Sequence, residues 1–321
     1  MKRIITLSIL LIVCAGCFGG NEQTQEEDKE NGPSYTTYQF SHDGQDFKII
    51  PFYDEVLEYI DSMEKNTELD NNEVYTKEVF DPFKETSSLD YITLGNYLSP
   101  TSDIEQLEKN TNKLVENQDK INEQIKEAVS ESAELLSGAD TTFYVFPVNP
   151  EDWFTIDNLE GVGGVTYLEN DILLSIDPSY SEETLKYTVA HEYHHTVNFF
   201  HNGEQSVYSV LDSVITEGKA DSFASIIYPD INVSWTEPLS EDAEAVVLEE
   251  LSTHAESTDQ NIFNDFSRGN PAKDIPRWSN YKIGYQITES FIENNPDTII
   301  TDWTKLDAKE VVEGSGYSEL Y

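Results

Sequence analysis

Cysteine is nearly absent from this sequence, since Cys14 and Cys17 are the only two among 321 residues. Both lie near the start, so no disulfide framework holds the rest of the chain together. Stability must therefore come from the burial of apolar side chains. A chain of this length buries roughly 75% of the surface that its unfolded form exposes, as one large domain or two small ones.

Basic residues are also scarce, because 19 Lys and Arg face 62 Asp and Glu, which gives a formal net charge of −43. Such an acidic surface repels nucleic-acid phosphates and anionic lipid headgroups. The composition therefore excludes nucleic acid as a partner, and it excludes attachment to a membrane through a basic surface.

The apolar run at residues 4–13 is too short to span a bilayer. Lys2 and Arg3 precede it as a short basic region, and small residues follow it. This order is typical of a signal peptide, which we expect to cover residues 1–16.

The four residues Cys14-Ala15-Gly16-Cys17 resemble a bacterial lipobox, in which cleavage occurs before a cysteine that then carries a lipid. Cys14 departs from that motif, which usually has Leu, Val or Ile there, and an ordinary secretory signal is the alternative. We expect Cys17 to be lipidated, with the acidic, apolar-poor residues 17–34 as a flexible tether. The protein would then be a lipoprotein on the extracytoplasmic face of the cell membrane.

The rest of the chain divides at about residue 138 into a helical N-terminal region, 35–137, and a domain at 138–321. Spacings of 3 and 4 in a mainly apolar stripe from Ile104 to Ile125 predict one long amphipathic helix. Because Thr111 and Gln118 also lie on this stripe, we expect the helix to pack on the protein's own body rather than to form a dimeric coiled coil. The domain begins with strands, which the β-branched and aromatic runs place at 141–148, 164–168 and 171–176, the last two joined by a tight turn at Glu169-Asn170. Helices are expected at about 181–201, 209–227, 240–256 and 279–294. The predicted fold class is α+β, with a small sheet followed by a helical C-terminal part.

The segment His191-Glu192-Tyr193-His194-His195 has the HExxH pattern of zinc hydrolases. His191 and His195 are four residues apart, so both imidazoles project from one helical face and can reach one ion. Glu192 stands beside them as the general base that takes a proton from a metal-activated water. An amphipathic helix with solvated histidines is the alternative. His194 points away from this face, and we expect it to be packed or exposed.

A catalytic zinc ion needs a third protein ligand, and the sequence offers two. Read onward, the motif continues through Asn198 to His201 and resembles the metzincin consensus. Those enzymes place a methionine turn beneath the metal, but the only methionines here, Met1 and Met63, precede the motif.

The second candidate is Glu217, which is followed four residues later by Asp221. This pair resembles the gluzincin arrangement, in which the next helix supplies a glutamate ligand and an aspartate that accepts a hydrogen bond from the first histidine. Such a partner is a physical need, because it fixes the orientation of the ligating ring. A solvated acidic face is the alternative, and we prefer Glu217 to His201 as the ligand of a single catalytic Zn²⁺ ion.

Four segments together resemble the YjaZ-like family of predicted zinc-dependent proteases: GGVTYLENDILLSIDP, VAHEYHHTV, EGKAD and YKIGYQI. The likeness covers roughly residues 107–293. It implies a zincin-like fold and a zinc metallopeptidase of the gluzincin type that hydrolyses a peptide or protein substrate.

Two further features bear on such a reaction. Tyr281, three residues before a glycine, resembles the tyrosine that steadies the oxyanion in gluzincin aminopeptidases, with Tyr285 and His254 as weaker candidates. The glycines at 161–164 precede a strand edge that could bind an extended peptide by strand addition, with Gly164→Val as the test. Two alternatives remain: an inactive zinc-binding or peptide-binding lipoprotein, and a structural zinc site completed by His201.

Overall fold

The computed structural model of this protein describes residues 36–66, 68–87, 98–203 and 207–320. The expected signal peptide, the lipidated Cys17 and the tether lie outside the described residues and stay predictions. Among the helices that the structure does describe, none has the length and apolar character to cross a membrane. Residues from Tyr35 to Tyr321 form one unit.

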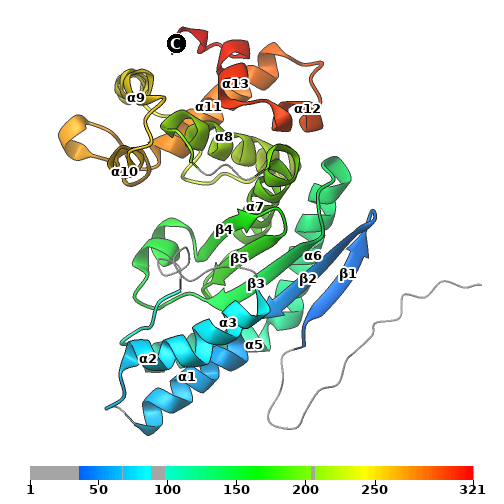
Figure 1. Ribbon diagram of the computed structural model, residues 1–321, viewed down its shortest axis with the longest axis vertical. Coiled ribbons are helices and arrows are strands. Elements are labelled where there is room, and N and C mark those ends of the chain that lie inside the picture. Colours follow the sequence, from blue (N-terminus) through cyan, green and yellow to red (C-terminus); the bar gives the residue numbers. More distant parts are fainter. Residues whose placement is uncertain (1–35, 67, 88–97, 204–206, 321) are drawn as a thin grey trace, which may run out of the picture. The chain divides into compact units, whose positions relative to one another are not determined.

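A five-stranded mixed sheet lies at the centre of this unit, with the strand order β1-β2-β3-β5-β4 (Figure 1). The pairs β1–β2 and β4–β5 are antiparallel, whereas β2–β3 and β3–β5 are parallel. The strands are β1 (Tyr38–His42), β2 (Gln45–Pro51), β3 (Thr141–Pro147), β4 (Val162–Leu168) and β5 (Asp171–Ile176). The strands and the tight turn predicted between residues 141 and 176 are thus confirmed.

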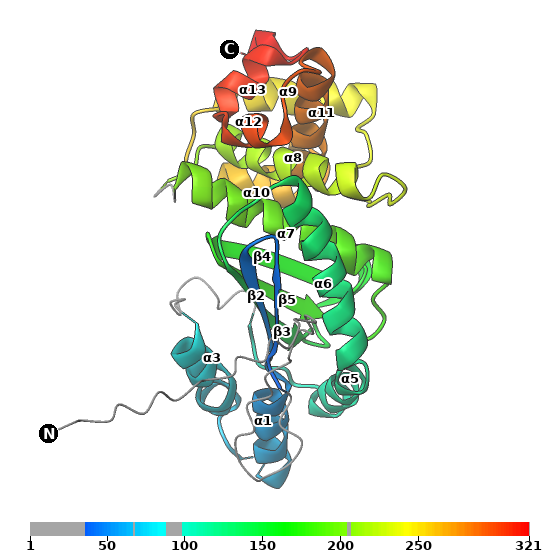
Figure 2. The same cartoon turned by 90° about the vertical axis from the view of Figure 1, so that its right-hand side faces the viewer.

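Both faces of the sheet are covered by helices, which explains the unbroken apolar run in β3. Phe143 and Val145 point into one apolar cluster together with residues of α6 (Gln118–Leu135) and α7 (Glu182–Asn202). Tyr144 and Phe146 point the other way, into a second cluster with residues of α1 (Tyr53–Lys65) and α3 (Asp81–Thr86). Figure 2 shows α6 running beside the sheet.

Helices account for most of the remaining described chain, and the predicted α+β class is confirmed. The four helices predicted after the sheet correspond to α7, α8, α9 and α11. Short helices that the sequence reading left out include α10, α12 and α13. The main helices are α1 (Tyr53–Lys65), α2 (Asn71–Tyr75), α3 (Asp81–Thr86), α5 (Ile104–Glu116), α6 (Gln118–Leu135), α7 (Glu182–Asn202), α8 (Val210–Ile227), α9 (Glu241–His254), α10 (Gln260–Arg268), α11 (Ser279–Asn294), α12 (Ile300–Lys305) and α13 (Ala308–Gly314).

The N-terminal region was expected to be helical, but residues 38–51 form the strands β1 and β2. Asp43 and Gly44 join these strands with φ of 45° and 85°, as a type I′ hairpin turn requires. Residues alternate between buried and exposed along β2. Since β2 pairs with β3, the sheet contains strands from both sides of the boundary expected at residue 138.

The single long helix predicted from Ile104 is broken at Asn117, where α5 ends and α6 begins. The Asn117 side chain donates to the Lys113 carbonyl oxygen at 2.7 Å, a local bond of the kind that competes with helix continuation. The apolar stripe still packs inward: Leu107, Leu114 and Ile121 are buried.

The close approach of α8 and α11 depends on two glycines that face each other. A Cβ atom on Gly218 would lie 2.1 Å from the carbonyl oxygen of Gly284, and one on Gly284 would lie 2.0 Å from that of Val214. Neither position has room for a side chain. This contact brings the start of α11 next to the segment of α8 that contains Glu217.

Candidate metal centre

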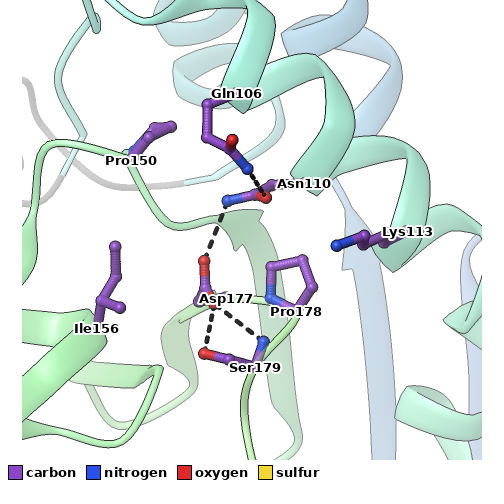
Figure 3. A pocket seen from close by; sticks show the side chains of 8 residues that line it. All are labelled: Gln106, Asn110, Lys113, Pro150, Ile156, Asp177, Pro178 and Ser179. Atoms are coloured by element: carbon purple, nitrogen blue, oxygen red, sulfur yellow. Dashed lines mark hydrogen bonds between the residues drawn. The ribbon is translucent and has the colours of Figure 1, made fainter.

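Helix α7 carries the HExxH segment, and its first turn is fixed on several sides. The Ser181 side chain accepts a hydrogen bond from the Thr184 backbone at 3.0 Å, as its position predicted. Just before it, Asp177 accepts from Asn110 at 3.0 Å and from the Ser179 backbone at 2.9 Å (Figure 3). These bonds tie α5 to the loop that leads into α7.

Two surface hollows lie near these elements, and neither contains the HExxH side chains. The hollow in Figure 3, of about 380 Å³, surrounds Asp177 and is closed on one side by Lys113. A second hollow, of about 420 Å³, lies beside the loop before α11. Neither hollow marks the metal centre, so the centre is located from the positions of its candidate ligand side chains.

His191, His195 and Glu217 each present one ligand atom, and these atoms lie within 4.8 Å of one another. The Nε2 atoms of the two histidines are 3.1 Å apart. Oε2 of Glu217 lies 3.2 Å from Nε2 of His191 and 3.5 Å from Nε2 of His195. Among the described residues, this is the group of His, Cys, Asp and Glu side chains that could hold a metal ion.

These separations fit a tetrahedral zinc ion. Ligand atoms about 2.0–2.1 Å from such an ion lie about 3.3 Å from each other. Oε2 of Glu217 is also buried and meets no hydrogen-bond donor in suitable geometry within the described part of the chain. Two imidazole nitrogens and one carboxylate oxygen, turned toward a common point, are a donor set that zinc prefers.

Asp221 holds the His191 ring in the orientation that this site needs. Its Oδ1 lies 3.0 Å from Nδ1 of His191, which turns Nε2 toward the other two ligands. Asp221 is fully buried and also accepts from the Trp235 indole at 3.2 Å and from the Tyr187 hydroxyl at 3.2 Å. Asp221 thus keeps the first histidine in place, and Trp235 and Tyr187 in turn hold Asp221.

The charges within the site favour an ionised carboxylate and a protonated histidine when no metal is bound. Burial alone would lower the pKa of His191, but the carboxylates of Asp221 and Glu217 raise this pKa well above its usual value. Burial alone would raise the pKa of Glu217, but His191 and His195 lower this pKa to about 2. At neutral pH a proton on His191 therefore competes with the metal.

We expect zinc binding at pH 7 to release about one proton per ion, because the raised pKa of His191 keeps that ring protonated without metal. Glu217 is already ionised and contributes none. Zinc affinity should accordingly fall as the pH falls, whereas the stabilisation of the metal-free fold by protonated His191 is lost as the pH rises through its raised pKa. Calorimetric titration in two buffers with different heats of ionisation measures the released protons. Equal heats in both buffers would contradict the expectation, and Asp221→Asn should release fewer protons.

Glu192 lies between α7 and the edge strand β4. Its Oε2 accepts a hydrogen bond from the Thr166 hydroxyl at 2.8 Å. A Cβ atom on Gly164 would lie 2.6 Å from Cγ and 2.7 Å from Oε1 of Glu192. Gly164 therefore makes room for this carboxylate, so Gly164→Val would displace Glu192 and would not by itself test peptide binding at the strand edge.

The remaining sequence candidates occupy different surroundings. The centre of the Tyr281 ring lies 6.3 Å from that of the His191 ring, so this tyrosine is next to one of the candidate ligands. His254 lies 3.7 Å from Glu250 within α9, outside the metal group. Tyr285 lies one turn beyond Tyr281 on α11, where Ser225 hydrogen-bonds to it; burial raises the pKa of its hydroxyl. The structure thus brings Tyr281, rather than His254, beside the candidate ligand His191.

The other two histidines of α7 are also outside the metal group. His201 packs against Phe200, with ring centroids 5.1 Å apart. His194 is fully buried and stacks on Trp303 at 5.5 Å, so of the two expected surroundings, packed or exposed, it has the packed one. Burial lowers the pKa of His194 well below its usual value.

A buried lysine that sequence reasoning missed supports the helix of Glu217. The Lys219 ammonium donates to the carbonyl oxygens of Thr304, at 3.1 Å, and Leu306. His194 also contacts Thr304, through its hydroxyl at 3.3 Å. The end of α12 thus connects α7 and α8 behind the ligands, and burial lowers the pKa of Lys219 to about 8. The only sequence signal was the position of this lysine four residues after Ile215 and four residues before Phe223, two apolar residues on the same helix face.

The sheet, the HExxH helix and the convergent His-His-Glu group define a protein with a candidate zinc centre on adjacent helices. A family model described as "Predicted Zn-dependent protease (DUF2268)" matches residues 121–313, and the chain belongs to this family. The resemblance to predicted zinc-dependent proteases seen in the sequence is thereby confirmed at the level of the family.

A curated relative has not been assigned a function. The uncharacterized protein YjfC of Bacillus subtilis (strain 168) is 29% identical over 173 residues, which are 49% of this chain and 54% of YjfC. The chain thus spans about half the length of this relative.

Proposed function

We propose that this protein is a zinc-dependent peptidase with a zincin-like site of the gluzincin type. His191, His195 and Glu217 would hold one zinc ion, and Glu192 would be the general base. The observation that carries the proposal is the convergence of two Nε2 atoms and one carboxylate oxygen at separations of 3.1–3.5 Å. The family description supports the same chemistry.

Each residue of the site would have its own role in peptide hydrolysis. Bound zinc supplies Lewis acidity and lowers the pKa of a water toward about 7. Glu192 would take a proton from the attacking water and would later give it to the leaving amine. Thr166 holds the Glu192 carboxylate by its 2.8 Å hydrogen bond, which keeps it beside the edge strand.

Tyr281 and β4 would position the substrate. A phenol next to His191 can donate a hydrogen bond to the carbonyl oxygen as negative charge develops on it. Among the described strands, β4 pairs with β5 alone and forms one edge of the sheet, where an extended peptide could add as a further strand. A peptide bound along β4 would then have its backbone between the proposed base Glu192 and the proposed oxyanion donor Tyr281.

The proposal is tested by incubating zinc-loaded protein with a mixture of unstructured peptides and identifying the products by mass spectrometry. We expect cleavage that stops when a chelator removes the metal and returns when zinc is added back. Peptides that bind without cleavage would favour the alternative of an inactive zinc-binding or peptide-binding protein. Cleavage that persists with chelator would contradict the proposed metal centre.

A further inference from the structure

Arg277, the residue before the N-terminal cap of α11, has an unusual environment for so acidic a chain. Its guanidinium carbon lies 5.9 Å from the Trp153 ring, 5.6 Å from the Phe154 ring and 5.8 Å from the Trp278 ring. Nη1 donates a hydrogen bond to Oδ1 of Asn158 at 2.7 Å. Aromatic faces hold a guanidinium plane without using its N–H donors.

No Asp or Glu within the described ranges forms an ion pair with Arg277, although the whole sequence has 62 such residues. A guanidinium has five N–H donors in a planar fork that matches a carboxylate. The hydrogen bond to Asn158 uses one of them. The half-buried Arg277 therefore keeps donors for a ligand.

A hollow next to Arg277 has a local excess of positive charge. It measures about 420 Å³, and its lining contains Arg268 and Arg277 but only one acidic residue, Asp274. These two are the arginines of the described chain, since the third, Arg3, lies outside it. In a protein with a net charge of −43, such a place can admit an anionic group that the rest of the surface repels.

Arg277 is connected to the metal centre through a short series of contacts. Trp278 packs against Trp235 with ring centroids 6.3 Å apart, and Trp235 donates to Asp221, the partner of His191. Tyr281 follows Arg277 by four residues and is the third residue of α11. On the other side, Asn158 precedes β4 by four residues. Arg277 thus lies where β4 and α11 both begin.

We propose that Arg277 binds a carboxylate of the peptide substrate within a few residues of the bond that is cut. This inference rests on the proposed peptidase function and deepens it by naming a substrate class. The carboxylate belongs either to an acidic side chain or to the C-terminus of the substrate. Trp153, with 58% of its surface exposed, lies 5.9 Å from the guanidinium and would contact a ligand bound there.

The test compares peptides that share one cleaved core and differ in a single charge. One set exchanges Glu for Gln at each position near the cut, and the other exchanges a C-terminal acid for an amide. We expect the wild type to prefer the charged member about 10- to 100-fold in kcat/KM, as a charge-assisted hydrogen bond contributes. In Arg277→Gln this ratio should fall to about one, and Arg277→Lys should keep part of it because it retains the charge.

Asn158→Ala is the matched control, because it removes the hydrogen bond between Arg277 and Asn158 but leaves the guanidinium. It should keep the preference for the charged peptide. If only the Glu/Gln set shows a preference, the bound group is a side-chain carboxylate. If only the acid/amide set shows a preference, the bound group is the terminal carboxylate. A wild type without preference, or Arg277→Gln with an unchanged ratio, would overturn the inference while leaving the peptidase in place.

A binding measurement separates failure of this inference from failure of the proposed function. Trp153 and Trp278 flank the guanidinium, so their fluorescence should report peptide binding even when no bond is cut. If the wild type cleaves nothing, the peptidase proposal fails. The subsite would still stand if charged peptides bind at least tenfold more tightly than neutral ones and Arg277→Gln removes the difference. Equal binding of charged and neutral peptides to the wild type would overturn the proposed subsite.

Discussion

Glu192→Gln should lower kcat by about 10²–10⁴-fold while the protein keeps its zinc, because general acid–base catalysis contributes a factor of this size. The amide has nearly the shape of the carboxylate and can still accept the hydrogen bond from Thr166. It has no basic oxygen to take the proton of the water. Steady-state kinetics on a cleaved peptide, together with metal content by mass spectrometry, measures both effects.

Glu183→Gln is the matched control for this substitution. Glu183 lies in the first turn of the same helix and is exposed, so its exchange removes one negative charge from α7 without touching the site. Its activity and zinc content should equal those of the wild type. A Glu192→Gln protein with full activity would contradict the proposed role of Glu192 as the general base.

Glu217→Ala should lose the metal, whereas His201→Ala should retain it. Loss of a hydrogen-bond partner of a ligand typically weakens metal binding 10- to 100-fold, and loss of the ligand itself should exceed this. Glu217→Ala should lose the metal because Glu217 supplies the only negative charge among the three candidate ligands. Its Oε2 lies 3.2 Å from Nε2 of His191. Mass spectrometry on dialysed protein should find one zinc ion per chain in the wild type and in His201→Ala.

Circular dichroism separates metal loss from unfolding in this experiment. Glu217→Gln keeps the size of the side chain and serves as a second variant if Glu217→Ala fails to fold. If His201→Ala alone loses zinc, the metzincin-like arrangement replaces the one proposed here. A wild type that binds no zinc would contradict both arrangements.

The metal helix was predictable from sequence because its information is local. The four-residue spacing of His191 and His195 fixes their common face, and the same reasoning applies to Glu217 and Asp221 on the next helix. The structure then brings the two helices together with His191 and Asp221 at 3.0 Å. Spacing alone did not decide between Glu217 and His201, because that choice depends on how α8 packs against α7.

Contacts between distant segments were not predictable in this way. Arg277 and Asn158 are 119 residues apart in sequence, and Lys219 and Thr304 are 85 apart. Trp235 reaches Asp221 only because the loop after α8 folds back over that helix. The hairpin at Asp43-Gly44 is different: its turn signal is local, and an interpretation dominated by helical spacing passed over it.

The glycine pair between α8 and α11 also offers a way to recognise distant relatives. A side chain at residue 218 or 284 would force the two helices apart, since even a Cβ atom there would lie 2.1 or 2.0 Å from a carbonyl oxygen. Glu217-Gly218 followed by Tyr281-x-x-Gly284 is therefore a signature of the geometry, whereas HExxH alone is a signature of the chemistry. A chain with HExxH but bulky residues at both glycine positions would have to hold its tyrosine farther from its glutamate, and would belong to another structural group.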